Sequence, residues 1–371
     1  MVILIRCNDI FSDPRAVKYV KFLQEKGIEH KLIGWDRDGN NVDEPNAVFW
    51  RRKAGYNVGS FSAVKNRIGW MWFVFRQLMR LKKENIVLHG CDVDSAFPAA
   101  CYTLFNRKAK LIFDIFDWFS ATLYDQKSYV LRAFKVMERF TVNHSDKIIL
   151  CEPERIEQIP FKVEASIISV LPNIPYFDDD SFLREDAQKK FSNELLTFSY
   201  VGGFCAERCL YEIIQLAEEG VINLAIAGFG DKDLEDKLEG LKDCPNIKYY
   251  GRVAYQDGLN ISLNSDVMYA MYSKVNPNHV YAAPNKYYES MFLGKALFST
   301  KGTIVEKKVL TNGTGYVSEE SVEDIRETIS KITKKSVITC GEKAHRLWFE
   351  KYGRYTANWL NNEYTSFISM C

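Results

Sequence analysis

Short apolar runs alternate along the chain with longer segments in which apolar residues recur every three or four positions. Residues 2–6, VILIR, have the continuous apolar character of a buried strand. The next segment starts with Asp13 and Pro14 and stops at Gly27, which suit an N-cap, a first helical position and a helix end. A second apolar run, IEHKLIGW, follows. This order predicts a parallel sheet with a helical crossover.

The alternation continues, pauses at one segment and then restarts. NIVLHG, KLIFDIF and DKIILCEP predict three more strands, with helices near residues 66–83, 95–105 and 128–143. Residues 170–177, VLPNIPYF, carry two prolines around an asparagine and predict a hinge. Further strands are predicted at LTFSYVGG, NLAIAGFG, NIKYYGRV, DVMYAMY and KALFST, and residues 321–371 are mostly helical. We therefore expect an α/β protein whose two doubly wound domains face each other across a cleft.

Composition fits this picture and excludes several classes of protein. The 371 residues, 47% hydrophobic and 26% charged, suit two globular domains, and a net charge of +1 argues against a general nucleic-acid binder. Nine scattered cysteines without a C-x-x-C predict free thiols in a reducing compartment and no Cys/His metal site. The first residues, MVILIRCNDIF, lack the features of a secretory signal. We expect a cytoplasmic protein that meets a membrane, if at all, peripherally from that side.

One stretch departs strongly from the balanced charge. Residues 50–85 contain nine Lys or Arg and a single Glu, a net charge of +8, interleaved with Trp70, Trp72, Phe73 and Phe75. A basic and aromatic helix of this kind predicts contact with an anionic membrane surface and a lipid-linked acceptor. The alternative is that the aromatic residues form the core face of a helix in the N-terminal domain.

Candidate chemistry is concentrated in residues 284–300, PNKYYESMFLGKALFST. The first N–H groups of a helix have no intrahelical partner, and Lys286 adds a positive charge there, which predicts a phosphate site. Glu289 lies four residues after Asn285, one turn further on the same face, and its carboxylate can accept two ribose hydroxyls. A surface helix capped by Pro284, with both charged side chains solvated, is the alternative interpretation.

Three more features lie at predicted strand ends of the same domain. SYVGGFCAER supplies Gly203 for close backbone approach to a phosphate and Arg208 for a bidentate grip. AIAGFGD contributes Gly228, and YYGRVAY places Arg252 and Val253 where a base edge could be met. Each feature alone is compatible with an ordinary turn. Their shared placement predicts a single ligand site.

In this order the motifs resemble the retaining glycosyltransferases of the GT-B fold, in particular the large family 4 group. The segments that carry the resemblance are DPRAVKYVKFLQEKG, LIFDIFDWFSA, SDKIILCEP, VLPNIPY, SYVGGFCAERCL and, most specifically, PNKYYESMFLGKALFST. The expected domains are an N-terminal acceptor-binding domain over 1–172 and a C-terminal donor-binding domain over 173–345. A C-terminal helix over 346–371 is expected to pack back on the N-terminal domain.

The resemblance implies a hexosyltransferase that moves a sugar from a UDP- or GDP-linked donor to a saccharide or lipid-linked acceptor. It implies anomeric retention, no metal ion and no other cofactor, in the biosynthesis of a surface polysaccharide such as a capsule, or of a glycolipid such as lipopolysaccharide. Glu289 matches the second Glu of the family's Glu-x7-Glu element, which holds the ribose, while Tyr281 replaces the first. Phe116 replaces a frequent His and leaves Asp117 as the polar group there, and Phe204 replaces the usual Arg after Gly203.

The expected site residues fall into three groups. The catalytic candidates are Asp117 and Glu289. The donor-binding candidates are Gly203, Arg208, Gly228, Arg252, Val253, Tyr281, Asn285, Lys286 and Glu289. The acceptor-binding candidates are Asp13, Arg15, His89 and Asp92. Residues 92–94, DVD, have the spacing of a metal-binding Asp-x-Asp but lie in the N-terminal half, where we favour an acceptor-site or structural role.

Two alternatives remain open at this stage. A non-catalytic GT-B-like binding or scaffold subunit is supported by Tyr281 and Phe116, which replace residues that are frequent in the active family. A UDP-sugar epimerase of the same fold is less favoured, because the sequence offers no clear pair of catalytic carboxylates.

Overall fold

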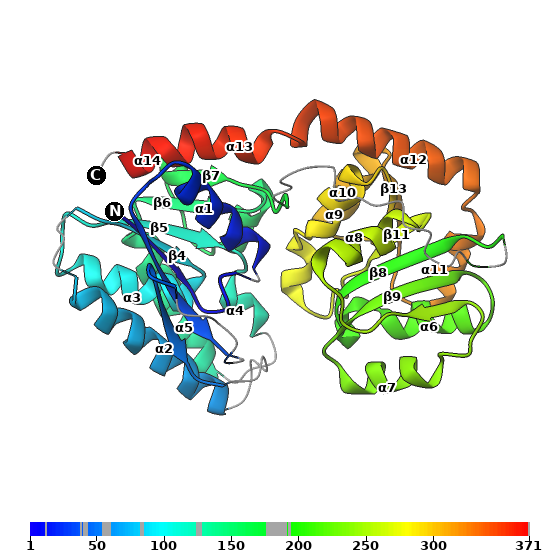
Figure 1. Cartoon of the computed structure of the whole chain (residues 1–371), viewed down its shortest axis with the longest axis horizontal. Helices are drawn as coiled ribbons and strands as arrows, with labels where there is room; N and C mark the ends of the chain where they lie inside the picture. The colour runs from blue at the N-terminus through cyan, green and yellow to red at the C-terminus, as the bar shows by residue number, and fades with distance from the viewer. Residues whose placement is uncertain are drawn as a thin grey trace. The chain divides into compact units, whose positions relative to one another are not determined.

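The structure, a computed structural model, describes residues 1–11, 13–37, 39, 44–53, 61–81, 85–123, 128–175, 191 and 194–369. The chain divides into two compact units (Figure 1). Unit 1 comprises Met1–Tyr176 together with Thr356–Cys371, and unit 2 comprises Phe177–Tyr355.

Unit 1 is built on a seven-stranded parallel sheet of order β3-β2-β1-β4-β5-β6-β7. The order reverses between β1 and β4, and in open parallel sheets such a switch point places ligands at the carboxyl ends of the strands. The strands are β1 Val2–Arg6, β2 His30–Asp36, β3 Ala47–Arg51, β4 Val87–Cys91, β5 Lys110–Ile115, β6 Lys147–Leu150 and β7 Ile168–Val170.

Helices cover both faces of this sheet (Figure 1). They are α1 Pro14–Glu25, α2 Phe61–Met79, α3 Val93–Thr103, α4 Phe119–Thr122 and α5 Ser128–Asn143, followed near the C-terminus by α13 Tyr355–Trp359, a π-helical turn Leu360–Tyr364 and α14 Thr365–Ser369. Helices α2, α3 and α5 lie on one face, and α1 lies with the C-terminal segment on the other. As predicted, Asp13 caps α1, since its side chain accepts from the Arg15 N–H at 3.0 Å, and Pro14 is the first helical residue.

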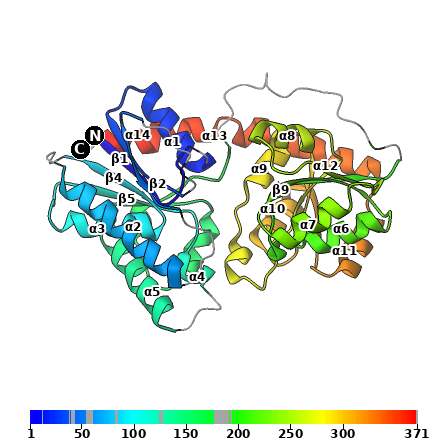
Figure 2. The same cartoon turned by 60° about the horizontal axis from the view of Figure 1, so that its bottom comes forward.

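Unit 2 is also built on a parallel sheet, with six strands in the order β10-β9-β8-β11-β12-β13. Figure 2 shows the helices of this unit around the sheet. Its strands are β8 Thr197–Gly203, β9 Asn223–Phe229, β10 Ile247–Tyr249, β11 Val267–Ala270, β12 Ala296–Thr300 and β13 Gly315–Ser318. Its helices are α6 Leu210–Glu218, α7 Lys232–Gly240, α8 Tyr255–Leu263, α9 Asn285–Phe292, α10 Ile304–Asn312, α11 Val322–Ser330 and α12 Lys334–Leu347. Buried Phe198, Tyr269 and Phe298 hold the middle of its core.

The predicted strands and helices are confirmed, and so is the α/β class with two doubly wound sheets. The sequence analysis missed strands β3, β7 and β13. They lie at sheet edges and few of their residues are fully buried, so they lack the buried character of the interior strands. The described cysteines are free thiols, as their spacing predicts. Among the described residues, none of the helices combines the length and the apolar composition that crossing a bilayer requires.

Candidate functional site

Helix α9 places Lys286 in its first turn, beside the carboxyl end of β8. A Cβ atom added to Gly202 would lie 2.9 Å from the Lys286 Nζ, so the glycine leaves room for the ammonium group. The Nζ also lies 5.0 Å from the centre of the Tyr200 ring. Burial lowers the pKa of Lys286 to about 8; Glu289 opposes this shift and Arg208 adds to it. The ammonium is therefore held in a poorly solvated place that favours an anionic ligand.

Arg208 is held beside this lysine by aromatic and imidazole groups. It ends a 3-10 turn, Ala206–Arg208, and its guanidinium lies 4.2 Å from the centre of the Tyr272 ring. Its Nη1 is 3.4 Å from Nε2 of His279, whose Nδ1 is 2.9 Å from the carbonyl oxygen of Ser273. With the Nδ1 proton donated to that carbonyl, Nε2 can accept from the guanidinium. The sequence had not pointed to His279, and a single His between β11 and α9 gave no usable signal.

Glu289 lies one turn deeper in α9 and forms a pair with a residue that sequence reasoning missed. The Tyr255 hydroxyl, from the start of α8, donates to the Glu289 Oε1 at 3.0 Å. Burial raises the pKa of Glu289, while Lys286 and Tyr255 oppose the shift. Burial and the neighbouring carboxylate raise the pKa of Tyr255 well above its usual value. Glu289 thus accepts a hydroxyl hydrogen bond in this structure, which is the role expected of it toward a ribose.

The other donor candidates lie around the same edge of the second sheet. Gly203 is the exposed last residue of β8, and Val253 is half-buried against α8. Gly228 lies in β9 with φ +153°, and a Cβ there would meet the Gly202 oxygen of β8 at 1.9 Å, so the close approach of the two strands requires a glycine at this position. The remaining three are Arg252, stacked 4.3 Å from the Phe229 ring centre, Tyr281, half-buried in the 3-10 helix Pro277–Tyr281, and Asn285, the first residue of α9.

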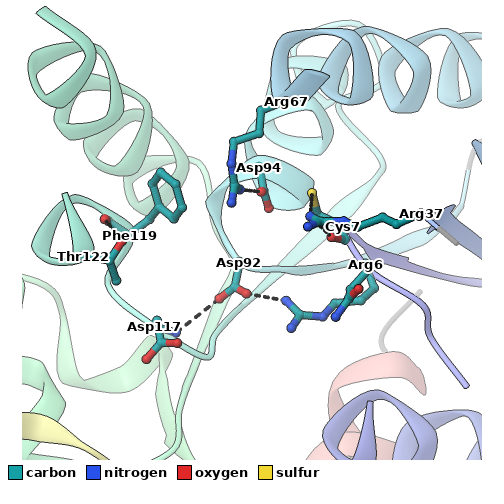
Figure 3. A pocket seen from close by; sticks show the side chains of 10 residues that line it. Arg6, Cys7, Arg37, Arg67, Asp92, Asp94, Asp117, Phe119 and Thr122 are labelled. Carbon is teal, nitrogen blue, oxygen red and sulfur yellow. Dashed lines mark hydrogen bonds and ion pairs between the residues drawn. The ribbon is translucent and has the colours of Figure 1, made fainter. Parts of the chain in front are cut away.

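Unit 1 contains a pocket of 220 Å³ at the carboxyl edge of its sheet (Figure 3). Its walls come from the segments that follow β1, β2, β4 and β5 and from α2, and they are Arg6, Cys7, Asn8, Arg37, Arg67, Asp92, Asp94, Asp117, Phe119 and Thr122. The expected acceptor residue Asp92 and the expected catalytic residue Asp117 lie here together.

Asp92 has an unusual backbone conformation, and its carboxylate has several hydrogen-bonding partners. Its φ of 64° and ψ of 166° belong to a region that is occupied almost only by glycine. Its Oδ1 accepts from the N–H groups of Phe116 at 3.0 Å and Asp117 at 3.2 Å, and its Oδ2 pairs with Arg6. Burial, opposed by Arg6, raises its pKa to about 6. Backbone strain that is maintained beside a pocket points to a functional requirement for the side chain.

Charges around the pocket are largely compensated. Asp94 pairs with Arg67, and Asp117, which is exposed, pairs with Arg155 at 3.2 Å. The buried Oδ1 of Asp94 has no hydrogen-bond partner in the described residues. The Phe116 ring, which stands where the resembling family often has a His, lies 4.2 Å from the Arg6 guanidinium carbon and 4.9 Å from that of Arg15. Phe116 therefore supports two arginines by cation–π contact.

The other acceptor candidates lie outside this pocket. Asp13 accepts from the Arg6 Nε at 2.8 Å, so it orients a pocket residue. Arg15 and His89 are buried and both contact Asp114 of β5, at 2.5 Å and 3.4 Å. The His89 Nδ1 lies 2.9 Å from the Tyr364 hydroxyl of the C-terminal segment. This burial favours a structural role for Arg15 and His89.

One group of possible metal ligands occurs in the described part of the chain. The ligand atoms of His89, Cys91 and Asp114 lie within 4.8 Å of one another and are buried. However, the Asp114 oxygens already accept from Arg15 and, at 2.8 Å, from Tyr19. A cation bound there would face the Arg15 guanidinium, so this group does not fit a metal ion.

No protein-family model matches the sequence, and a search of the curated proteins gave no match. Solved structures are similar along nearly the whole chain. The E. coli trehalose-6-phosphate protein bound with UDP-2-fluoro glucose aligns with a TM-score of 0.70 at 10% identity, over 99% of this chain and 98% of that one. WaaG, a glycosyltransferase involved in lipopolysaccharide biosynthesis, aligns with a TM-score of 0.63 at 12% identity, over 95% and 96%.

A protein from Listeria monocytogenes assigned as a UDP-N-acetylglucosamine 2-epimerase is also similar. Its TM-score is 0.63 at 11% identity, over 100% of this chain and 97% of that one. At these identities the likeness shows the fold alone. The chain has the GT-B fold, with two Rossmann-like domains.

Proposed function

We propose that the protein is a nucleotide-sugar-dependent glycosyltransferase. The observation that carries the proposal is the convergence of Lys286, Arg208 and Glu289 at the carboxyl edge of the second sheet, beside the glycine end of β8. A nucleoside diphosphate presents a diphosphate next to a ribose diol. The cations Lys286 and Arg208 are complementary to the diphosphate. The carboxylate of Glu289, one helical turn after Lys286, is complementary to the ribose diol. The fold shared with a UDP-sugar-bound protein and with WaaG supports this assignment.

In the proposed donor complex each residue has a separate task. Lys286, Arg208 and the first N–H groups of α9 hold the diphosphate, with Gly203 allowing close approach of the backbone. Glu289 accepts from the ribose hydroxyls, and Arg252 and Val253 meet the base. Tyr281, in place of the first Glu of Glu-x7-Glu, leaves the contacts to the donor sugar to other groups.

The pocket of unit 1 is proposed to hold the sugar unit of a saccharide or lipid-linked acceptor. Its volume of 220 Å³ and its paired arginines and aspartates suit a polyhydroxylated, uncharged group. Asp92 and Asp117 would orient that sugar by accepting from its hydroxyls. Surface polysaccharide or glycolipid assembly in the cytoplasm is the proposed setting.

The proposed reaction retains the anomeric configuration and needs no metal. As the bond between the sugar and the diphosphate breaks, negative charge grows on the phosphate oxygens. Lys286, Arg208 and the helix terminus stabilise that charge, which is the step in which preorganised cations contribute most. The acceptor hydroxyl attacks from the same face and transfers its proton to the departing phosphate.

Titration calorimetry with UDP and GDP tests donor binding directly. We expect one of the two nucleotides to bind with a dissociation constant between about 1 μM and 1 mM, the usual range for enzyme substrates. The same protein, given a radiolabelled donor of the preferred base and an acceptor pool, should form a labelled product in the presence of a metal chelator. Failure of both nucleotides to bind would exclude the proposed function.

The same experiment separates the two alternatives. A binding or scaffold subunit would bind the nucleotide but would not release it from the labelled donor under any acceptor condition. The similarity to the Listeria protein supports testing an epimerase as well. An epimerase would convert the donor sugar to its epimer without any acceptor. Either result would replace the transferase assignment.

Substitution of Asp92 tests the acceptor pocket. We expect Asp92→Asn to raise the acceptor KM roughly tenfold, the size of a lost charge-assisted hydrogen bond, with donor affinity unchanged. Because the pKa of Asp92 is raised to about 6, wild-type kcat/KM for the acceptor should fall as the pH drops below about 6, and the variant should lack this limb.

Two further variants control this result. Asp92→Gly relieves the backbone strain but removes the carboxylate, so it should show the same acceptor defect. Asp146→Asn, just before β6 and therefore at the opposite edge of the sheet, should behave as wild type. Normal acceptor kinetics in both Asp92 variants would show that the pocket is not the acceptor site.

A further inference from the structure

Helix α2 carries two apolar stripes on opposite sides, and only one of them is explained by the fold. Trp70, Val74 and Leu78 are buried in the core of unit 1. Ile68, Trp72, Phe75 and Met79 recur at the same helical spacing, within a stripe about 60° wide on the other side. Ile68 and Trp72 are each 61% exposed and Met79 is 48% exposed. The sequence left open whether the aromatic residues of this helix face the core or a membrane. The structure divides them: Trp70 lies in the core, and Trp72 lies on the surface.

The outer stripe continues onto the loop that follows α3. The Trp72 and Phe75 rings are stacked with centroids 6.0 Å apart, and the Phe75 ring meets Phe105 edge-on at 5.9 Å. Phe105 is 68% exposed and Leu104 is 55% exposed. We call these residues the outer patch: Ile68, Trp72, Phe75, Met79, Leu104 and Phe105. Phe75 is half-buried at the inner margin of this patch, where it also packs against the core of unit 1, and the other five side chains are exposed. Exposed aromatic and aliphatic side chains gathered from two elements mark an interaction site.

The charges beside the outer patch indicate what it binds. The exposed residues Lys65 and Arg76 on α2, Arg80 just after it, and Arg107 and Lys108 beyond Phe105 are all cationic. Helix α2 has no acidic residue. A helix with Trp and Phe on its outward side and Lys and Arg next to them is suited to lie in the plane of an anionic membrane.

We propose that the outer patch docks unit 1 onto an anionic lipid bilayer. The apolar side chains enter the boundary between headgroups and acyl chains, and the long side chains of Lys65, Arg76 and Arg80 reach the phosphates. This inference goes beyond the proposed transferase activity. Within the basic region 50–85, the proposal assigns the contact to α2 and not to the first residues of the region, where Arg51 faces Asp36 at 3.8 Å. Lys82 and Lys83, which the sequence also includes in that region, lie outside the described residues.

Flotation of the full-length protein with vesicles tests the proposal. The vesicles contain either phosphatidylcholine alone or equal parts of phosphatidylcholine and phosphatidylglycerol. We expect binding to the second kind only, weakened when salt is raised from about 0.1 M to about 1 M, because the Debye length falls from about 10 Å to about 3 Å. Arg76→Glu with Arg80→Glu should weaken binding at least about 25-fold, since each lost cation contributes about fivefold.

Matched substitutions elsewhere make the test specific. Ile68→Asp and Phe105→Asp should abolish flotation, whereas Ile338→Asp and Phe349→Asp, at residues 62% and 71% exposed in unit 2, should not. Lys334→Glu with Lys335→Glu is the charge control. Binding that is absent, or equally reduced by the control variants, would overturn the proposal. So would a sedimentation coefficient that drops from dimer to monomer in Ile68→Asp, because a second copy of the chain would then cover the patch.

Discussion

Replacing Lys286 with Met should reduce kcat/KM for the nucleotide-sugar donor by about 10²–10³, the usual effect of removing one preorganised group that stabilises charge in a transition state. Lys286 sits in the first turn of α9, close to Gly202 and to the Arg208 charge. Methionine keeps most of the length and volume of the side chain but cannot interact with a phosphate oxygen. Steady-state kinetics with the preferred donor, combined with calorimetry for the free nucleotide, measures the loss.

The pH dependence supplies a second readout of the same group. Burial lowers the pKa of Lys286 to about 8, so the ammonium form of the free protein is lost as the pH rises through about 8. Wild-type kcat/KM should therefore decline on the alkaline side of about pH 8, and Lys286→Met should lack that decline.

A matched lysine is available on the same part of the fold. Lys295 is also half-buried with a lowered pKa, but it follows α9 and precedes β12, at the opposite edge of the sheet. Lys295→Met should retain wild-type kinetics. If Lys286→Met stayed within about threefold of wild type, the loss would be well below the effect of one such group, and Lys286 could not be a phosphate ligand.

The convergence of residues in the proposed donor site was largely predictable because its signals are local in sequence. Pro284, Lys286 and Glu289 fall within two turns of one helix, and Gly294, with φ +64°, follows its C-terminal end. Such spacing is decided by helix geometry alone. The hydrogen bond from Tyr255 to Glu289 joins residues 34 positions apart, and the contact between His279 and Arg208 joins residues 71 apart. No pattern within a single element reveals contacts of that kind.

The proposed acceptor site shows the opposite case. Asp92 and Asp117 could be placed at a sheet edge because each follows a recognisable strand. Arg15 and His89 have equally suggestive sequence positions, but their side chains turn inward to Asp114, a residue that reads as a polar interruption of a strand. Whether a polar side chain near a strand end faces a pocket or the core depends on which partner the tertiary fold brings to it.

The buried network around Asp114 leads to the largest expected effect on stability. Asp114 has no exposed surface, and its carboxylate accepts from Arg15, from the Tyr19 hydroxyl at 2.8 Å and from His89. Replacing it with Ala leaves the buried Arg15 guanidinium without its carboxylate. We expect Asp114→Ala to lower the free energy of unfolding of unit 1 by about 3–5 kcal/mol, the cost of breaking a buried ion pair on one side.

Denaturant unfolding followed by tryptophan fluorescence suits this measurement, because six of the seven tryptophans belong to unit 1. Glu219→Ala breaks an exposed pair with Arg326 and should leave the free energy of unfolding close to that of the wild type. The double variant Arg15→Met with Asp114→Leu should recover most of the loss, since it removes both charges. An Asp114→Ala protein as stable as the Glu219→Ala control would refute the proposed role of the network.

The pH dependence of unfolding should follow the same groups. Burial acts to raise the pKa of Asp114, but Arg15 and His89 outweigh it and hold that pKa well below its usual value. Burial also lowers the pKa of His89, despite the opposing effect of Asp114. In both cases the unfolded chain binds more protons than the folded one, so stability must increase with pH.

The Asp114 contribution to stability is complete above the unfolded carboxyl pKa of about 3.9 and is lost progressively as the pH falls below it. The His89 contribution is complete above about pH 6.5. Asp114→Ala should therefore flatten the stability curve below about pH 5, and a curve that keeps its wild-type slope there would assign the acid sensitivity to other carboxylates.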